Sequence, residues 1–535
     1  MTDSSKDMTP DSESLAHPDV TASLDAAGYI TDAVYTWNFF NYQAPIHLSY
    51  IARLNGHSAP STDEAFTYCD LGSGNGVTVN LLADALPHGQ FWGIDINPDH
   101  TRNARAFSDA AGLSNVTHLN QSFETRSENE LPQFDFITLH GVYSWVSPEI
   151  QAQIVAFVDR HLKPGGLLYL SYNALPGWAP ITPLWAMMRD ATLGEGLSSI
   201  ERARKGIAYL RFLHDQKATY FEKNPAAGEH LKRLVKGGLD YFIHEMCHDW
   251  FTPCYFDDVA NAFRTSGLVY AGTAAIHRNR DRNIIPGRFR KYVAESNDRQ
   301  AQESRRSLLR NEMFRRDIYI RSQTPPSSAI GSGLDHFMLG PHRGQSDIKT
   351  DAKIGERKLS FTGPVFDTII PLAQTGTNSI GDIRTQLPGP DDVAIEAVQD
   401  LIASRQFIPM AKASHAGDTP QGVRYRIASE INRLYLTRRL PQDGKCYLAS
   451  PVTGSGFRVN FQTGMMILSL DGRTEDEAKT WALDYVQSLS SDTLERLKIR
   501  TNEPDAEKVS RAFGNFRERY LHRLIRLGIL ELIES

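Results

Sequence analysis

The stretch FTYCDLGSGNG, residues 66–76, decides the fold, because a glycine-rich turn here separates an apolar strand-like run from a helix-like run. FTYCDL has the character of a buried strand, and VTVNLLADAL, residues 77–86, has the spacing of a helix. Gly72, Gly74 and Gly76 remove side chains from the turn, so a ligand can approach the backbone. Unpaired N–H groups at the start of the following helix attract an anionic group such as a carboxylate. The stretch therefore predicts a ligand site at a strand–turn–helix junction, with Asp70 and Ser73 beside the glycines.

A second acidic residue, Asp95, lies at the end of the strand-like run FWGID, nineteen residues after Gly76. A carboxylate at this place can accept both ribose hydroxyl hydrogens of a nucleoside. A pyrophosphate-binding fingerprint needs Gly or Ala where this chain has Val77, so the dinucleotide version fits less well. The turn and the acid together predict a nucleoside cofactor, with Ile96 next to Asp95 in the same site.

Strand-like and helix-like runs alternate from residue 66 to residue 173. After the first pair come a helix over 98–111, the strands VTHLN and QFDFITL, the helix PEIQAQIVAFVDRHL and the strand LLYLSYN. Apolar strands that alternate with helices require a parallel sheet with helices on both faces. The fold class is therefore α/β and Rossmann-like. An aromatic-rich segment with an amphipathic stretch from Pro45 to Leu54 precedes it as a helical lid.

The chain has 535 residues, more than one hydrophobic core usually serves, and the pattern changes along it. After about residue 180 the sequence is mostly helical, with a strand near 270 and Arg and Glu at helical spacing over 298–321. A Pro/Ser/Gly linker follows, then a helix, short helix, helix and strand of winged-helix character. We expect a disordered tail (1–20), a ligand-binding domain with its lid (21–180), a mostly helical domain (181–322), a winged-helix-like domain (334–430) and a C-terminal α+β domain (431–535).

Composition excludes several classes of function. The net charge of -6 gives no global attraction for nucleic acid, and no apolar run approaches the roughly 20 residues of a membrane span. The four cysteines form no CxxC pair, so we expect reduced thiols and a cytoplasmic protein. His244-Glu245-Met246-Cys247-His248 matches HExxH, but Asp249 and the lack of a clear third ligand disfavour zinc, so no metal is predicted.

On these residues the chain resembles the class I methyltransferases. The resemblance implies S-adenosylmethionine as the cofactor, with Asp70 or its loop at the amino-acid moiety and Asp95 at the ribose. It also places the adenine beside Ser122 and Phe123, which follow the third strand.

Three further segments carry a narrower resemblance: HGVYSWVS (140–147), LSYNALPGW (170–178) and HEMCHDWFTPCYFDDV (244–259). They are similar to bacterial proteins in which a methyltransferase domain precedes a methyltransferase regulatory domain. Some of these, including rickettsial-type enzymes, methylate lysines of surface or outer-membrane proteins. The resemblance covers most of the chain, strongly to about residue 275, and implies a protein partner.

Methyl transfer is an in-line displacement, so the enzyme must position a nucleophile and exclude water. Tyrosine and histidine side chains near the strand ends are candidates for orienting the acceptor. They are Tyr42 of the lid, His140 and Tyr143 after the fourth strand, and Tyr172 on the fifth, with Tyr29, Tyr35 and Asn173 as further liners. His140 is also a candidate cofactor contact. For the lid tyrosines, plain helix packing is the competing interpretation.

Three functions stay open at this stage. The first is transfer of a methyl group to a protein lysine, because the later domains favour a macromolecular acceptor. The second is methylation of a lipid, glycan or natural-product intermediate, and the third is non-catalytic binding of the cofactor. The Asn-Pro-Pro-Tyr motif of amide and adenine N-methyltransferases is absent after the fourth strand, which disfavours a nucleic-acid base as acceptor.

Overall fold

The computed structural model describes residues 37–123, 131–193, 196–322, 324, 326–327, 331–342, 348–387, 391–414, 422–497 and 506–533. The expected tail, Tyr29 and Tyr35 lie outside these ranges. The described residues form two compact units, one of residues 183–249 and one that holds the rest. Each unit is described by itself below.

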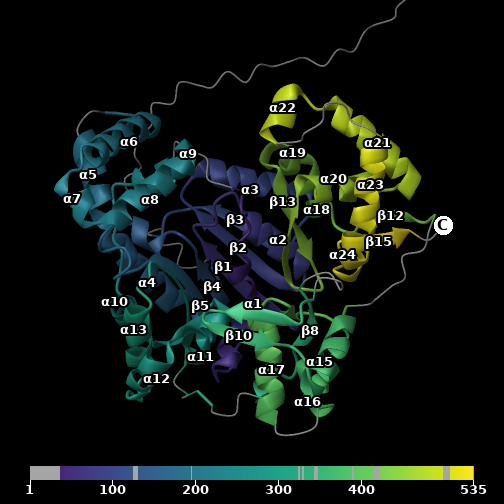
Figure 1. Ribbon diagram of the computed structural model, residues 1–535, viewed down its shortest axis with the longest axis horizontal. Helices are drawn as coiled ribbons and strands as arrows, with labels where there is room; N and C mark the ends of the chain where they lie inside the picture. The colour runs from purple at the N-terminus through teal and green to yellow at the C-terminus, as the bar shows by residue number, and fades with distance from the viewer. Residues whose placement is uncertain are drawn as a thin grey trace, which may run out of the picture. The chain divides into compact units, whose positions relative to one another are not determined.

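A mixed seven-stranded sheet lies at the centre of the larger unit, in the order β3-β2-β1-β4-β5-β7-β6 (Figure 1). Its strands are β1 (Phe66–Leu71), β2 (Gly89–Asp95), β3 (Val116–Asn120), β4 (Phe134–Leu139), β5 (Leu162–Asn173), β6 (Leu268–Thr273) and β7 (Phe314–Arg321). The first five strands are parallel, and β7 runs antiparallel to both β5 and β6. The predicted α/β class and parallel arrangement are confirmed.

Helices cover both faces of this sheet, as its apolar strands require. One face packs against α1 (Pro45–Leu54), α2 (Val77–Ala85) and α3 (Pro98–Ala110), and the other packs against α4 (Pro148–His161) and α10 (Phe256–Arg264). The helix α1 has the bounds that its amphipathic pattern predicts. It begins with proline, which suits the first helical turn, and it ends at Asn55-Gly56.

The smaller unit is helical. Its elements are α5 (Thr182–Thr192, whose first residue belongs to the larger unit), α6 (Ser199–Asp215), α7 (Thr219–Lys223), α8 (Pro225–Lys236) and α9 (Leu239–Met246). A capping box of Ser198 and Glu201 starts α6, so the local sequence fixes that helix end.

Residues 250–321 differ from the expected helical domain, because they complete the central sheet. They hold α10, β6, η3 (Ile276–Asn279), α11 (Asp281–Ile284), α12 (Gly287–Ala294), α13 (Arg299–Leu309) and β7. The strand near 270 was predicted, but β7 was not, because its arginines continue the helical spacing of α13. Ile318, Tyr319 and Ile320 are buried between β5 and β6, and this non-local pairing defines the strand.

A small module follows, drawn in green in Figure 1. It contains α14 (Gly331–Leu334), β8 (Met338–Pro341), the hairpin β9 (Asp351–Ile354) and β10 (Arg357–Ser360), α15 (Pro364–Thr375), α16 (Ile380–Thr385), α17 (Asp391–Ala403) and β11 (Phe407–Met410). The predicted series of helix, short helix, helix and strand is present, and β11 pairs with β8.

The C-terminal module, drawn from green to yellow in Figure 1, mixes short strands and helices as expected. It contains β12 (Arg424–Ile427), α18 (Glu430–Leu434), α19 (Leu440–Asp443), β13 (Lys445–Ser450), β14 (Ser455–Asn460), α20 (Phe461–Leu470), α21 (Glu475–Ser488), α22 (Ser491–Arg496), α23 (Ala506–Phe516), α24 (His522–Arg526) and β15 (Leu530–Ile533). The sequence pattern predicts a helix for the last apolar run of the chain. The end of this run forms β15 instead, which pairs with β12. Within the described ranges, no helix combines the length and apolar character needed to cross a bilayer.

Candidate active site

The glycine turn between β1 and α2 has a backbone that favours glycine. Gly72, Gly74 and Gly76 have φ values of 75°, 55° and 71°, in the left-handed region. A Cβ on Gly72 would lie 2.6 Å from Cγ2 of Val142, and one on Gly76 would lie 2.5 Å from Cβ of Ala104. Other residues at these two positions would therefore displace the turn from the ends of the strands.

Asp95 lies beside this turn, and its carboxylate accepts three hydrogen bonds. Its Oδ2 accepts from the backbone N–H of Gly74 at 2.7 Å, and its Oδ1 accepts from the N–H of Asn97 at 2.9 Å. The ring Nδ1 of His100 lies 3.2 Å from the same Oδ1. The carboxylate thus points toward the glycine turn and ties it to the start of α3.

Asp70 is buried at the end of β1 and contacts the lid. Its Oδ1 accepts hydrogen bonds from Nε2 of Gln43 and from Oγ1 of Thr138, each at 2.7 Å. Burial raises the pKa of this carboxyl to about 7, against the lowering effect of its two donors. Sequence reasoning missed Gln43, although a polar residue between the aromatic and apolar runs of the lid was a usable signal.

A narrow cavity adjoins the turn. Its walls come from the turn itself, from the start of α2, from the lid residues Asn38, Phe40 and Gln43, and from His140. The groups around the turn fit a nucleoside cofactor with an amino-acid moiety, because bare backbone, a helix start and the Asp70 carboxylate meet in the cavity and the Asp95 carboxylate adjoins the turn.

Four of the predicted cofactor residues, Asp95, Ile96, Ser122 and Phe123, lie at the carboxyl ends of β2 and β3. They do not line the cavity, and neither does Gly76. Asn120 joins the two strand ends by donating to the carbonyls of Asp95 and Ile96 at 3.0 and 2.8 Å. The roles of these residues toward the cofactor stay predictions.

His140 lies between two aromatic rings at the cavity wall. Its ring centroid is 4.0 Å from that of Phe40 and 5.9 Å from that of Tyr169, and its Nδ1 is 2.8 Å from the hydroxyl of Tyr169. Burial, with the charge of Arg316, lowers the pKa of His140 to about 3. The imidazole is therefore neutral near pH 7 and is a weak base.

The structure separates the other three acceptor candidates. Tyr42 is half-buried and its ring lies 4.9 Å from the guanidinium carbon of Arg316. Tyr143 is buried on the other face of the sheet, with its ring 6.0 Å from that of Phe263. Tyr172 is buried in that same apolar cluster and donates its hydroxyl to Oδ2 of Asp317 at 2.7 Å. Of the four acceptor candidates, His140 lines the cavity, and Tyr42 lies beside it on the lid without lining it.

A cleft of about 350 Å³ opens on the far side of the same lid segment. The lid contributes Asn41 and Tyr42, and β6 and η3 contribute residues 274–277. The green module and the C-terminal module supply the other walls, including Arg405 and Phe457. Among the side chains that the structure describes, no group of three or more His, Cys, Asp or Glu is placed to hold a metal ion. The side chain of His244 lies outside that set.

Comparison with known proteins agrees with this geometry. A family model described as a methyltransferase domain matches residues 69–168, and one described as a predicted methyltransferase regulatory domain matches residues 239–321. The glycine turn, the two carboxylates, the Rossmann-like sheet and the match to a methyltransferase domain indicate an S-adenosylmethionine-dependent methyltransferase.

Some relatives match nearly the whole chain and others match part of it. The uncharacterized protein sll1526 of Synechocystis is 28% identical over 509 residues, which are 94% of this chain and 99% of that protein. The uncharacterized protein RP028 of Rickettsia prowazekii is 29% identical over 220 residues, 41% of this chain and 86% of that protein. The structure of PKMT2 from Rickettsia typhi in complex with AdoHcy shares the fold, with a TM-score of 0.68, 19% identity, and coverage of 93% of this chain and 99% of that one.

Proposed function

We propose that this enzyme transfers a methyl group to the side-chain amine of a lysine in a protein. The placement of the lid segment 38–43 carries the proposal, because one side of it lines the cofactor cavity and the other lines the cleft. In-line transfer needs the amine to contact the methyl group, so an acceptor side chain would extend from the cleft past this segment to the donor. The likeness to PKMT2 and to the motifs of bacterial protein lysine methyltransferases supports a protein acceptor.

The cleft suits a macromolecular acceptor better than a small molecule. Its walls come from the methyltransferase domain, the green module and the C-terminal module, so a bound chain could contact all three. A small substrate would use one of these surfaces and leave the others without a role. A surface or outer-membrane protein is the acceptor class that the sequence resemblance implies.

The side chains near Tyr42 suit an amine nucleophile. The cofactor supplies an electrophilic methyl group on a sulfonium, and the new N–C bond forms as the C–S bond breaks. Only a neutral amine can attack, and the positive charge of Arg316 beside Tyr42 disfavours the ammonium form. The Tyr42 hydroxyl can orient the amine, and the ring face favours a methylated ammonium product. His140 is too weak a base to take the proton, so we assign it to holding the cavity wall.

We also propose that the reaction takes place in the cytoplasm. All four cysteines are buried free thiols, which fits a reducing compartment.

Labelled methyl transfer tests the acceptor class directly. The full-length protein and S-adenosylmethionine with a labelled methyl group are incubated with protein, lipid, polysaccharide and small-molecule fractions of bacterial cells. We expect label in the protein fraction and its recovery as methyl-lysine after acid hydrolysis. Label confined to lipids, glycans or small molecules would refute the proposal.

A pair of tyrosine variants tests the acceptor site. Tyr42→Phe removes one hydroxyl from the cleft and should lower kcat about tenfold, because one hydrogen bond that orients the amine is lost. Cofactor affinity should stay within about twofold. Tyr292→Phe, at a position 46% exposed on α12, is the matched control and should change neither quantity. Unchanged kcat in Tyr42→Phe would remove this residue from the acceptor site.

A further inference from the structure

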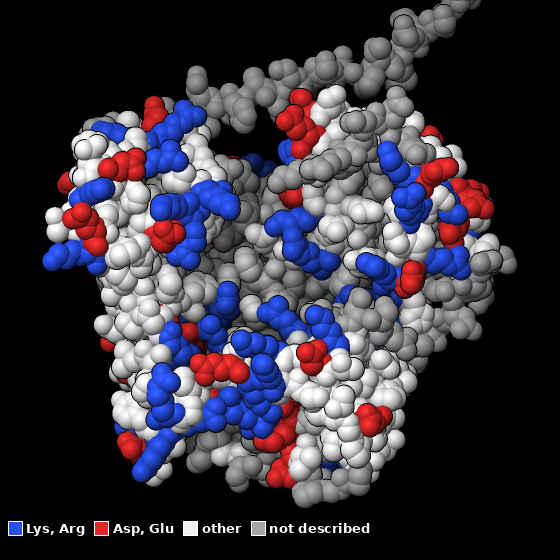
Figure 2. Space-filling view, viewed as in Figure 1, with Lys and Arg blue, Asp and Glu red and all other residues white. Residues whose placement is uncertain are grey.

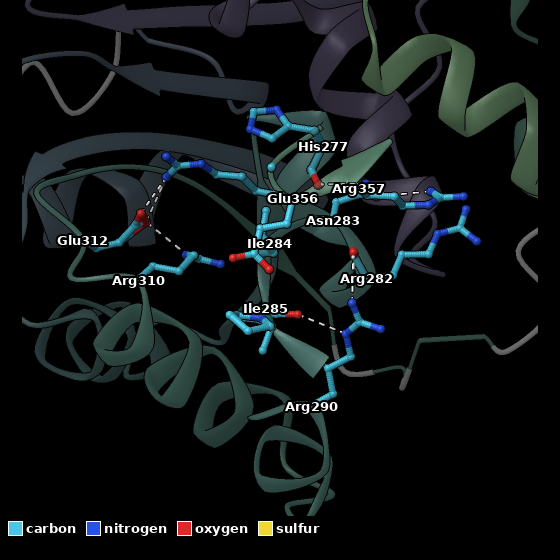
Figure 3. A pocket seen from close by; sticks show the side chains of 13 residues that line it. His277, Arg282, Asn283, Ile284, Ile285, Arg290, Arg310, Glu312, Glu356 and Arg357 are labelled. Carbon is cyan, nitrogen blue, oxygen red and sulfur yellow. Dashed lines mark hydrogen bonds and ion pairs between the residues drawn. The ribbon is translucent and has the colours of Figure 1, made fainter. Parts of the chain in front are cut away.

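A third pocket, of about 600 Å³, shares no lining residue with the cofactor cavity and shares only His277 with the cleft. Three segments enclose it: residues 277–290 from η3 into α12, the end of α13 with the turn before β7, and the turn of the hairpin β9–β10 (Figure 3). The hairpin fits closely, because a Cβ on Gly355 would lie 2.3 Å from the carbonyl oxygen of Asn283. We call this site the arginine pocket.

Its lining carries more positive than negative charge. Five arginines line it, Arg278, Arg282, Arg290, Arg310 and Arg357, with only two carboxylates, Glu312 and Glu356. Lys and Arg side chains gather in the lower middle of Figure 2, the region where Figure 1 places α11 and β10.

Glu312 and Asp400 lie deeper than the pocket arginines they pair with, whereas Glu396, a second partner of Arg282, is exposed. Arg278 is 36% exposed and its partner Glu312 is 6% exposed, and Arg357 is 30% exposed against 9% for Asp400. Glu312 pairs with both Arg278 and Arg310, and Asp400 pairs with both Arg282 and Arg357. The buried acids therefore fix the arginines in position, while the pocket side presents positive charge.

Some guanidinium groups keep donors that the protein does not use. Within the described residues, the buried Nε and Nη1 of Arg310 have no hydrogen-bond partner, and Figure 3 shows this side chain pointing in among the pocket residues. Arg290 donates Nε to the carbonyl of Ile285 and Nη2 to that of Arg282, and no described carboxylate pairs with it. A planar fork with free N–H groups is suited to an oxyanion.

The pKa of His277 is lowered in part by the same positive charges. This residue lines the pocket, and burial together with the charges of Arg278, Arg405 and Arg310 lowers its pKa to about 4. A bound anion would offset these charges.

We propose that the arginine pocket binds a small molecule through a phosphate group. Arg290 has no described carboxylate partner and Arg310 keeps two unused donors, and the several oxygens of a phosphate or diphosphate can accept from both forks where a single carboxylate cannot. The volume is in the range of small-molecule sites, roughly 300–1,000 Å³. The overall charge of -6 disfavours nucleic acid as the source of the phosphate.

Binding is tested on the full-length protein without reference to methyl transfer. Calorimetry and thermal shift are measured with inorganic phosphate and with pyrophosphate, against sodium chloride and acetate at equal ionic strength. We expect saturable binding of both phosphates, tighter for pyrophosphate, and a raised Tm. Absence of binding, or an equal effect of acetate, would overturn the proposal. Saturable binding of a polyglutamate peptide or an oligonucleotide, with none of either phosphate, would overturn it in favour of a macromolecular partner.

Two variants on the same helix locate the site. Arg290→Gln removes a pocket guanidinium and should weaken pyrophosphate about tenfold, the effect of losing one charge-assisted hydrogen bond. Arg288→Gln, two residues earlier on α12 and outside the lining, is the matched control and should bind as the wild type does. Arg278→Gln repeats the measurement of pyrophosphate binding at a pocket arginine of another segment. Equal binding by all three variants would show that phosphate binds elsewhere and would overturn the assignment.

Discussion

Asp95 illustrates how one side chain can serve both the fold and a ligand. Its carboxylate accepts hydrogen bonds from two backbone N–H groups and contacts one imidazole, all within the loops that follow β1 and β2. A carboxylate has room for about four hydrogen bonds, so ribose hydroxyls can be added or exchanged for these donors. The residue therefore positions the glycine turn and remains able to contact the cofactor.

Replacing this carboxylate should weaken the cofactor more than the fold. Asp95→Asn removes the charge and one acceptor, and we expect the Kd for S-adenosylmethionine to rise about 10- to 100-fold, as for loss of one or two charge-assisted bonds. Calorimetry measures the affinity, and circular dichroism checks the fold. Asp99→Asn, at an exposed acid on α3 that pairs with Arg102, is the control. Equal affinity in the two variants would contradict a ribose role for Asp95.

Asp70 gives the site a dependence on pH. Burial raises its pKa to about 7 in the folded protein, from an ordinary value of 3.8. Its contribution to stability is therefore complete below pH 3.8 and is lost as the pH rises through 7. A cofactor with a cationic amino group favours the ionised carboxylate, so its binding should follow the opposite trend.

We accordingly expect S-adenosylmethionine to bind more tightly at pH 8 than at pH 6. The ionised fraction of a carboxyl with a pKa near 7 rises about tenfold over this interval, and affinity should rise by up to the same factor. In Asp70→Asn, the rise of affinity that comes from ionisation of Asp70 should be lost, while any pH dependence that comes from the ligand itself remains. Calorimetric Kd values at pH 6, 7 and 8 decide the matter, and identical profiles for both proteins would exclude Asp70 as the cause.

At the residue scale, the sequence predicts those site residues that lie close to one another along the chain. The glycines, Asp70 and Asp95 lie in one strand–turn–helix–strand run, so their order in the chain shows their proximity. Gln43 and Arg316 reach the site from distant segments, through the lid and β7. The polar character of Gln43 within the lid was a signal that it has a role, but the sequence around these two residues does not indicate which groups they contact.

At the scale of elements, the junction of β5 and β7 shows why Tyr172 differs from the other tyrosine candidates. Its hydroxyl donates a hydrogen bond to Asp317, whose carboxylate also accepts hydrogen bonds from Nε and Nη2 of Arg315. Arg315 in turn bonds to Glu303 on α13. This buried network ties the sheet to the helix that covers it, so Tyr172 serves the architecture.

Tyr172→Phe should therefore affect stability and leave catalysis unchanged. Loss of one buried hydrogen bond to a charged acceptor should lower the free energy of unfolding by about 1–2 kcal/mol, because Asp317 keeps its bonds to Arg315. Tyr42→Phe should show the reverse, with lowered kcat and unchanged stability. Urea unfolding and steady-state kinetics on both variants make the comparison. A loss of kcat without a loss of stability in Tyr172→Phe would return this residue to the acceptor site.

Helices with strong periodicity were predictable and short non-local strands were not. The amphipathic pattern places α1 correctly, and proline, asparagine and glycine mark its ends. The strand β7 carries three arginines or aspartates among its first four residues, which hides its apolar half from a local pattern. Pairing with β5 and β6 decides its conformation, and the pairing with β5 spans more than a hundred residues.

At the scale of the larger unit, the modules share one apolar core. The cluster that begins with Phe39 and α1 continues through α2 and α3 into the green and C-terminal modules. Phe107 of α3 stacks on Tyr435 with ring centroids 4.9 Å apart, and Ser429 donates to Asp84 at 2.8 Å. The sequence suggests separate domains with their own linkers, because a local pattern cannot show which apolar faces meet.

The shared core predicts that the catalytic part cannot be isolated. A fragment that ends at residue 322 would leave the outer faces of α1, α2 and α3 without their cover, including Leu86 and Phe107, which the full chain buries. Exposed apolar surface of this extent leads to aggregation or to loss of fixed packing. We expect the fragment to be insoluble or to bind a hydrophobic dye, and to show no measurable affinity for S-adenosylmethionine. The full chain, purified in parallel, should bind the cofactor and unfold its larger unit in one calorimetric transition. A soluble fragment with the affinity of the full chain would show that the methyltransferase domain folds without the later modules, and that their contacts only accompany its fold.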